Sequence, residues 1–317
     1  MTALGVGITF ATIALLLTEF LRHRRTGLAA YGWAGLLGLI AAECLMFRGF
    51  QFISIYFTPI AWTCYILLAD AAVLAIRGHS RLHDDPRQLA WIALLSIPLW
   101  LIFEAYNLRL QNWTYTGVPQ AWPFALLGYG WSFATITPGI FETADLIESF
   151  GWFGPVPPFQ FSKIAQKMAI VFGAICLLVP ALVPQALAAH LFALVWVGFI
   201  FLLDPINFRL GLPSVIGDLA EGRVSRFYSL LTSGFVCGWL WEFWNYWAAA
   251  KWHYIFPILQ HWKIFEMPIP GYLGFLPFAL ECFTMYVTAT WILRGRTRET
   301  AHIRNTTMTT DSENAAD

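Results

Sequence analysis

Phe103-Glu104-Ala105-Tyr106-Asn107 and Trp241-Glu242-Phe243-Trp244-Asn245 are two copies of one pattern. In both, an acid follows an aromatic residue and an asparagine stands three positions after the acid. The two glutamates are separated by the same offset as the two asparagines. The flanking matches are Trp113/Trp252, Tyr115/Tyr254, Pro138/Pro277 and Glu142/Glu281, which share an offset one position longer, and Trp62/Trp196 and Asp70/Asp204, which share a slightly shorter one. Such near-constant spacing indicates an internal duplication.

The composition is that of a polytopic membrane protein. Hydrophobic residues make up 58% of the chain and charged residues 12%, against about 45–50% and 25% in soluble domains. The net charge is zero, so bulk electrostatics favour no nucleic-acid partner. Neither a phosphate-binding glycine loop nor a dinucleotide fingerprint occurs. The five cysteines lie in apolar runs without paired spacing, and we interpret them as buried thiols. We therefore expect no metal and no cofactor.

Apolar runs of about 20 residues are long enough to cross a bilayer as helices. We expect an all-α integral membrane bundle of about nine such helices. The first is an extra transmembrane helix rather than a signal peptide, because no basic region precedes it. The predicted spans are 3–21, 28–47, 52–76, 89–108, 127–147, 164–183, 186–204, 227–249 and 270–293. The polar segment after Arg294 is predicted to be a disordered cytoplasmic tail.

The basic residues predict how the chain crosses the membrane. If the N-terminus faces outward, fifteen of the nineteen Lys and Arg residues lie in, or next to, cytoplasmic segments. The four on the outer side are Arg48, Arg109, Lys251 and Lys263. This bias is what the positive-inside rule predicts, and it favours an odd number of spans. We expect a protein of the cell (inner or plasma) membrane with its N-terminus outside and its C-terminus in the cytoplasm.

The duplication maps onto whole helices. Spans three to five correspond to spans seven to nine, and we expect span two to correspond to span six, although we find no matched letters there. Because the offset is four helices, the halves have the same orientation, as in transporters built from parallel repeats. The predicted parts are an extra helix (1–27), a first half (28–160), a second half (161–293) and the tail (294–317).

The duplicated Glu-x-x-Asn pairs are the first candidate site. Residues three apart share one face of a helix, so Glu104 lies beside Asn107 and Glu242 beside Asn245. Both pairs are predicted near the outer ends of their spans. A single glutamate there could simply reach lipid headgroups, but a duplicated pair favours a shared buried site.

Glu142 and Glu281 are the second candidates, each four residues after a proline that kinks its helix. No other charge stands within ten residues of Glu281, so it is not interfacial. A carboxyl group in an apolar pocket favours its protonated form and can act as a general acid. The alternative is a protonated glutamate that joins helices by hydrogen bonds.

Aromatic residues surround these acids. Trp241 and Trp244 flank Glu242, and their faces could stabilise a carbocation or simply pack. The Trp-x-Tyr residues are expected either in the aromatic belt of the membrane or in the substrate site. Asp70 and Asp204 are second-tier candidates, because an aspartate at the end of a helix is commonly a cap. We therefore expect a substrate to contact Asn107, Asn245, Trp113, Tyr115, Trp241, Trp244, Trp252 and Tyr254.

The duplicated arrangement resembles the lycopene cyclase domain of the integral-membrane carotenoid cyclases of bacteria, archaea and fungi. The matching stretches are Trp241-Glu242, Trp252-His253-Tyr254 and Leu276-Pro277 to Glu281, with their first-half counterparts. The family usually has Trp-Asp where this chain has Trp-Glu, and Pro-x-Glu-Glu where it has Pro-Phe-Ala-Leu-Glu. The related integral-membrane terpene cyclases also rely on intramembrane acids.

The resemblance implies a redox-neutral cyclisation or isomerisation of a long isoprenoid. Glu281 and Glu142 would be the acids, and Glu242 and Glu104 would be bases or orienting groups. Two other functions stay open. Repeat symmetry and buried acids also suit a proton-coupled transporter of a small or lipidic substrate, and acids that only join helices suit a membrane scaffold. In each case we expect a membrane protein with a hydrophobic partner; the oligomeric state is left open.

Overall fold

The structure, a computed structural model, describes residues 1–295, and they fold almost entirely into helices. The all-α prediction is confirmed, and the predicted tail lies mostly outside the described residues. Nine of the helices within this range are long. They are α1 (Thr2–His23), α2 (Ala30–Phe47), α4 (Phe57–Arg77), α6 (Pro86–Leu110), α7 (Trp122–Glu148), α8 (Lys163–Leu182), α10 (Phe192–Arg209), α12 (Ser225–Trp247) and α13 (Tyr272–Arg294).

Short elements connect these helices. They are α3 (Gln51–Ile55), α5 (Arg81–Asp84), α9 (Gln185–Ala188), α11 (Val215–Ala220), the 3-10 turn η1 (Ile269–Gly271) and the strands β1 (Trp113–Thr116), β2 (Lys251–Tyr254), β3 (Lys263–Ile264) and β4 (Met267–Pro268). Two predicted spans therefore begin with a separate short helix, because α3 precedes α4 and α9 precedes α10.

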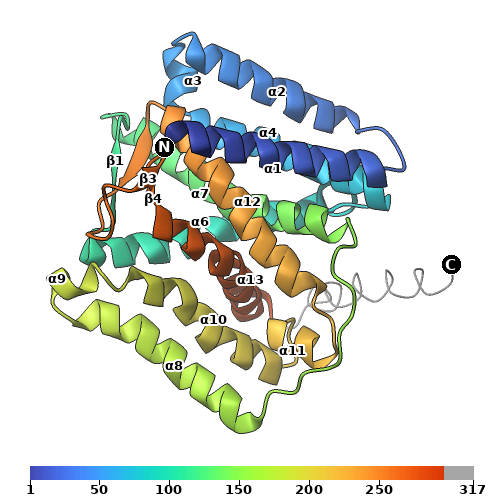
Figure 1. Cartoon of the computed structure of the whole chain (residues 1–317), viewed down its shortest axis with the longest axis vertical. Coiled ribbons are helices and arrows are strands. Elements are labelled where there is room, and N and C mark those ends of the chain that lie inside the picture. Colours follow the sequence, from blue (N-terminus) through green and yellow to red (C-terminus); the bar gives the residue numbers. More distant parts are fainter. Residues whose placement is uncertain (296–317) are drawn as a thin grey trace.

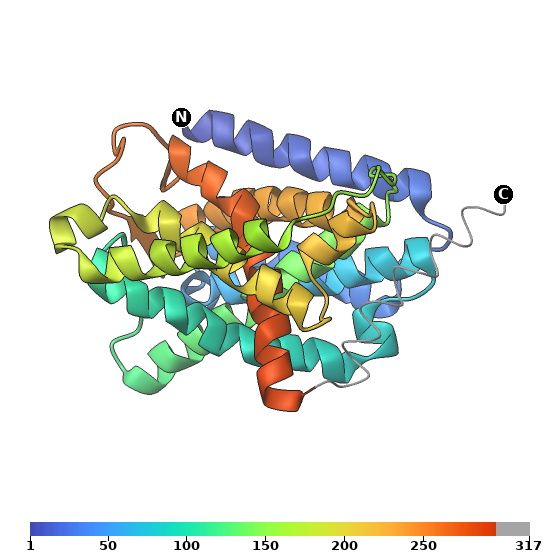
Figure 2. The same ribbon diagram turned by 90° about the horizontal axis from the view of Figure 1, so that it is seen from below.

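Seven of the described helices are long and apolar enough to cross a membrane. The long helices α7 and α12 are not among these seven, and both lie in the middle of the molecule (Figure 1). Their burial agrees with their composition, since polar side chains there face other helices. Figure 2 shows α1 along one edge of the molecule and α13 running steeply across the other long helices.

The two halves pack their helices in the same way. Helix α2 lies against α4 as α8 lies against α10, and a glycine permits each contact. A Cβ atom on Gly35 would lie 2.5 Å from the carbonyl oxygen of Cys64, and one on Gly173 would lie 2.7 Å from that of Gly198. The offset between Gly35 and Gly173 equals the offset between the two Glu-x-x-Asn motifs. The offset between their contact partners, Cys64 and Gly198, equals the offset between Asp70 and Asp204. These glycines supply the match between spans two and six that comparison of the sequence did not reveal. Small residues of this kind allow helices to pack closely.

A short β-ribbon joins the halves at one end of the bundle. Strand β1 pairs antiparallel with β2, with Trp113 opposite Tyr254, Thr114 opposite His253 and Tyr115 opposite Trp252. Because Trp113 matches Trp252 and Tyr115 matches Tyr254 in the repeat, this register is symmetric about the central pair. It is the register that a local two-fold axis through the ribbon would produce. An extended linker, residues 149–162, then connects α7 to α8.

Candidate functional site

Glu104 accepts three hydrogen bonds through a single carboxylate oxygen. The donors to its Oε1 atom are Trp100 Nε1 at 2.9 Å, Trp113 Nε1 at 3.2 Å and the hydroxyl of Tyr115 at 2.5 Å. Two of these donors belong to the Trp-x-Tyr stretch, which forms β1. The third, Trp100, stands four residues before Glu104 on the same face of α6, so its helical spacing could have revealed it.

Glu242 repeats this arrangement with fewer donors. Its Oε1 atom accepts from Trp252 Nε1 at 3.4 Å and from the hydroxyl of Tyr254 at 3.0 Å. The side chain is fully buried, and its Oε2 atom has no hydrogen-bond partner among residues 1–295. The two sites thus share one design but differ in how many donors hold the carboxyl group.

The asparagines of the repeated motif hold the strands in place. Asn107 accepts from the backbone N–H of Trp113 at 3.2 Å and donates to the carbonyl oxygen of the same residue at 2.9 Å. Asn245 makes both bonds with Trp252, each at 2.9 Å. Each side-chain amide is therefore occupied by backbone. Asn107 and Asn245 were predicted to bind substrate. In the structure each one instead holds the Trp-x-Tyr stretch of its half against the glutamate.

Replacing Asn245 by Ala should lower the free energy of unfolding by about 2 kcal/mol, because it leaves the partly buried backbone N–H and carbonyl oxygen of Trp252 without their partners. Thermal unfolding of the purified protein in detergent measures the change. Gln120→Ala, in an exposed position of the loop after β1, is the control and should unfold as wild type does. A stable Asn245→Ala protein would show that β2 needs no such anchor.

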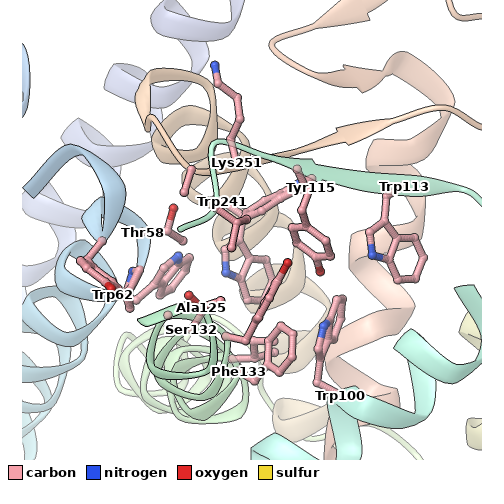
Figure 3. A pocket seen from close by; sticks show the side chains of 18 of the residues that line it. Thr58, Trp62, Trp100, Trp113, Tyr115, Ala125, Ser132, Phe133, Trp241 and Lys251 are labelled. Carbon is pink, nitrogen blue, oxygen red and sulfur yellow. The ribbon is translucent and has the colours of Figure 1, made fainter. Parts of the chain in front are cut away.

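An aromatic pocket lies beneath the ribbon, between the two halves (Figure 3). Its walls come from α4, α6, β1, α7, α10, α12, β2 and α13 and are almost entirely apolar. The aromatic residues that line it are Tyr56, Trp62, Trp100, Trp113, Tyr115, Tyr129, Phe133, Trp196, Trp241, Trp252, Tyr254, Phe275 and Phe278.

Five of the residues expected to contact substrate line this pocket, and they are Trp113, Tyr115, Trp241, Trp252 and Tyr254. Trp244 is not part of the lining. Its indole N–H donates to Glu43 at 3.3 Å, and its ring packs edge-on against Trp62 with the centroids 5.1 Å apart.

The four predicted acids all lie outside the pocket lining, but two of them are one hydrogen bond away. Glu104 reaches the pocket through Tyr115, and Glu242 reaches it through Tyr254. Burial, reinforced by the neighbouring carboxyl groups, raises the pKa of both tyrosine hydroxyls well above its ordinary value. The tyrosines therefore stay protonated at neutral pH and donate to the glutamates behind them.

Glu142 and Glu281 occupy equivalent helices but different surroundings. Glu142 lies 3.7 Å from the guanidinium of Arg81, which also pairs with Asp145 at 2.8 Å. Glu281 is fully buried, and neither of its carboxyl oxygens has a hydrogen-bond partner among the described residues. It lies one turn beyond Phe278, whose ring forms part of the pocket wall. Arg81, in the loop helix α5, is a neighbour that the repeat pattern does not predict.

The aspartates of the second tier anchor the short helices after α4 and α10. Asp70 accepts from the hydroxyl of Tyr31 at 2.6 Å, the hydroxyl of Ser80 at 2.8 Å and the backbone N–H of Leu82 at 2.9 Å. Asp204 accepts from the backbone of residues 215 and 216, at 2.8 and 2.9 Å. In both halves the aspartate thus holds the start of the following helix, α5 or α11.

No group of three or more His, Cys, Asp or Glu side chains that could hold a metal occurs within residues 1–295. No family model, curated protein or solved structure matches the chain.

Proposed function

We propose that the protein is a membrane-embedded enzyme that cyclises or isomerises a long isoprenoid by proton transfer, without oxidation or reduction. The observation that carries this proposal is the aromatic pocket with a Tyr–Glu pair from each half at its wall. The pocket walls are apolar enough to accept a hydrocarbon chain, and each pair supplies one group that can exchange a proton with a bound substrate.

The hydrogen bonds favour different roles for the two glutamates. Three donors converge on Glu104, and donors stabilise the charged form of a carboxyl group. Glu242 receives two longer bonds and keeps one buried oxygen without a partner, which favours the protonated form because burial penalises charge. We therefore assign the acid to Glu242 and the base to Glu104.

In this mechanism the proton reaches the substrate through Tyr254. The tyrosine O–H turns from Glu242 to the bound substrate, and the protonated Glu242 then donates to the phenol oxygen. The tyrosine O–H protonates a carbon–carbon double bond while the proton of Glu242 moves onto the phenol oxygen, so Glu242 becomes a carboxylate and the substrate a carbocation. A second double bond attacks the cation and closes the ring. The product forms when a neighbouring C–H bond gives its proton to Glu104 through Tyr115. One proton enters and one leaves, and no electrons are exchanged with another reactant.

The pocket would protect the cation during these steps. Indole faces attract a positive charge through their quadrupoles, and several of them line the walls. The ribbon and the aromatic residues also keep water from the cation, which would otherwise add to it and give an alcohol.

We further propose that all nine long helices cross the bilayer of the cell membrane, with the N-terminus outside and the C-terminus in the cytoplasm. Two hydrogen bonds at the ends of the bundle support this arrangement. Asn112, in the loop after α6, donates to the carbonyl oxygen of Ala189 after α8 at 2.9 Å, and Trp152 after α7 donates to Glu19 near the end of α1 at 3.1 Å. If the other long helices cross the bilayer, the two residues of each pair lie on the same side of it only when α7 crosses as well.

The experiment that tests the function is expression of the full chain in cells that accumulate linear isoprenoids, followed by analysis of the lipid extract. A new product of unchanged molecular mass is the expected result. Absence of any new product from linear C20–C40 substrates would sink the enzyme proposal. Proton-coupled uptake by liposomes that contain the protein would favour the transporter instead.

A further inference from the structure

The β-ribbon has a second face, which turns away from the aromatic pocket. Successive side chains point to opposite faces of a strand, and Trp113 and Tyr115 of β1 line the pocket. Figure 3 shows Lys251 of β2 on the side of the ribbon opposite to these two residues. The register therefore gives this far face of the ribbon four side chains, Thr114, Thr116, Lys251 and His253.

A line of hydrogen bonds runs through the histidine of this face. The Nε2 atom of His253 lies 2.9 Å from the hydroxyl oxygen of Thr116, and its Nδ1 atom lies 2.9 Å from a carboxyl oxygen of Glu266. A carboxylate can only accept hydrogen bonds, so Glu266 holds the imidazole proton on Nδ1. The Nε2 atom is then the acceptor and the hydroxyl of Thr116 the donor. This is the order of a nucleophile, its general base and the carboxylate that orients the base.

The three residues of this triad differ in how far solvent reaches them. Thr116 is exposed at the end of β1. The side chain of His253, in β2, is 31% exposed, and that of Glu266, in the turn between β3 and β4, is 16% exposed. A reactant can therefore reach the hydroxyl group directly, while the carboxylate is the most shielded of the three.

The surroundings of the triad suit a lipid ester. Lys251 stands directly opposite Thr116 in the ribbon. Its ammonium group donates to the carbonyl oxygen of Tyr246 at 2.6 Å, which uses one of its three N–H groups. A cation on this face would stabilise negative charge that develops on a carbonyl oxygen. An acyl chain would pack on the loop between β2 and β3, where three apolar side chains are 51%, 53% and 60% exposed, namely Ile255, Leu259 and Trp262.

We propose that Thr116, His253 and Glu266 form a second active site, which hydrolyses lipid esters by acyl transfer. The Oγ1 atom of Thr116 attacks the ester carbonyl carbon while its proton moves to Nε2 of His253. The bond from this carbon to the alcohol oxygen breaks, and the alcohol leaves with the proton, so the acyl group remains on Thr116. Water then gives a proton to Nε2 and attacks the acyl group, which leaves as a carboxylic acid while the threonine oxygen regains its proton. Each cycle consumes one ester and one water, and Glu266 is a positioning residue that acts through the histidine.

The test uses the purified full chain in detergent and p-nitrophenyl octanoate, whose hydrolysis is followed by the absorbance of nitrophenolate. Thr116→Ala should lower kcat/KM at least about 100-fold, because it removes the nucleophile, and His253→Gln about 100-fold, because it removes the base. Thr116→Ser keeps a hydroxyl group and should stay within about tenfold of wild type. Thr114→Ala, on the same face but outside the triad, is the matched control and should hydrolyse the ester as wild type does. Mass spectrometry of acid-quenched wild type should find an octanoyl group on Thr116.

Glu266→Gln separates orientation of the base from a structural contact. It should lower kcat about tenfold or more and leave KM and the unfolding temperature within error of wild type. Hydrolysis that survives Thr116→Ala would overturn the proposal, even if His253→Gln abolishes it, because an exposed imidazole can cleave an activated ester by itself. Absence of hydrolysis by wild type would overturn it too. The triad and the aromatic pocket lie on opposite faces of the ribbon, so Thr116→Ala should leave the isoprenoid product unchanged, and either activity can fail without the other.

Discussion

Glu242→Gln is expected to lower product formation by at least about 100-fold, which is the low end of what a general acid contributes. Glutamine has nearly the shape of glutamate, and its amide oxygen can still accept from Trp252 and Tyr254. The variant should therefore fold and bind substrate as wild type does. What it lacks is an acidic proton to replace the one that Tyr254 gives away, so the first step stops. Product analysis of cell extracts, normalised to the amount of protein in the membrane, measures the loss.

Glu104→Gln should behave differently, because its role comes after the cation has formed. The substrate should still be consumed, but the cation would lose its proton at other carbons or capture water. We therefore expect a changed mixture of products rather than none. Glu221→Gln, on the surface at the end of α11 and 44% exposed, is the control for loss of a carboxyl group. If Glu242→Gln makes the wild-type product at the wild-type rate while Glu281→Gln makes none, the acid is Glu281.

The repeat in the sequence predicted several residues that the structure places on the wall of the aromatic pocket or directly behind it, but not their contacts. Spacing alone places Asn245 beside Glu242 on one helix face, and the structure agrees with that. The spacing does not reveal that Asn245 binds the backbone of Trp252 instead of lining the pocket, because that bond depends on how the chain returns after α12. The ribbon was not predicted for a similar reason. Strands of four residues form only because the two halves supply each other's partner, and neither copy alone has the length of a typical strand.

The surroundings of the deeper acids also depend on tertiary structure. Sequence predicted Glu142 and Glu281 as equivalent, yet only Glu142 has a cation beside it, because Arg81 sits in a loop helix whose position is set by Asp70. The matching residue of the second half is Val215, which cannot pair with a carboxylate. The two copies of the repeat thus keep equivalent backbone positions but differ in these side chains, and the proposed acid and base roles require such a difference.

The second large effect is expected in a labelling experiment that separates nine membrane crossings from seven. Helices α7 and α12 are less apolar than the others, and a hydropathy criterion alone would leave both out of the membrane. The residues before and after α7 would then lie on the same side. If α7 crosses, Gln120 lies outside the cell and Gln160 lies in the cytoplasm. Both side chains are exposed in loops that flank this helix, so they form a matched pair.

In the full-length protein, Gln120→Cys should react with a membrane-impermeant maleimide in intact cells, while Gln160→Cys should react only after the membrane is permeabilised. Wild type gives the background from its own five cysteines. The contrast is expected to be all or none, because a loop lies on one side of the membrane or the other. Labelling of both variants in intact cells would mean that α7 does not cross. The loop after α8 would then lie across the membrane from the loop after α6, and the bond between Asn112 and Ala189 could not form. Since Asn112 also binds Asn107 and Ile255 at the base of the ribbon, the geometry of the pocket depends on this crossing.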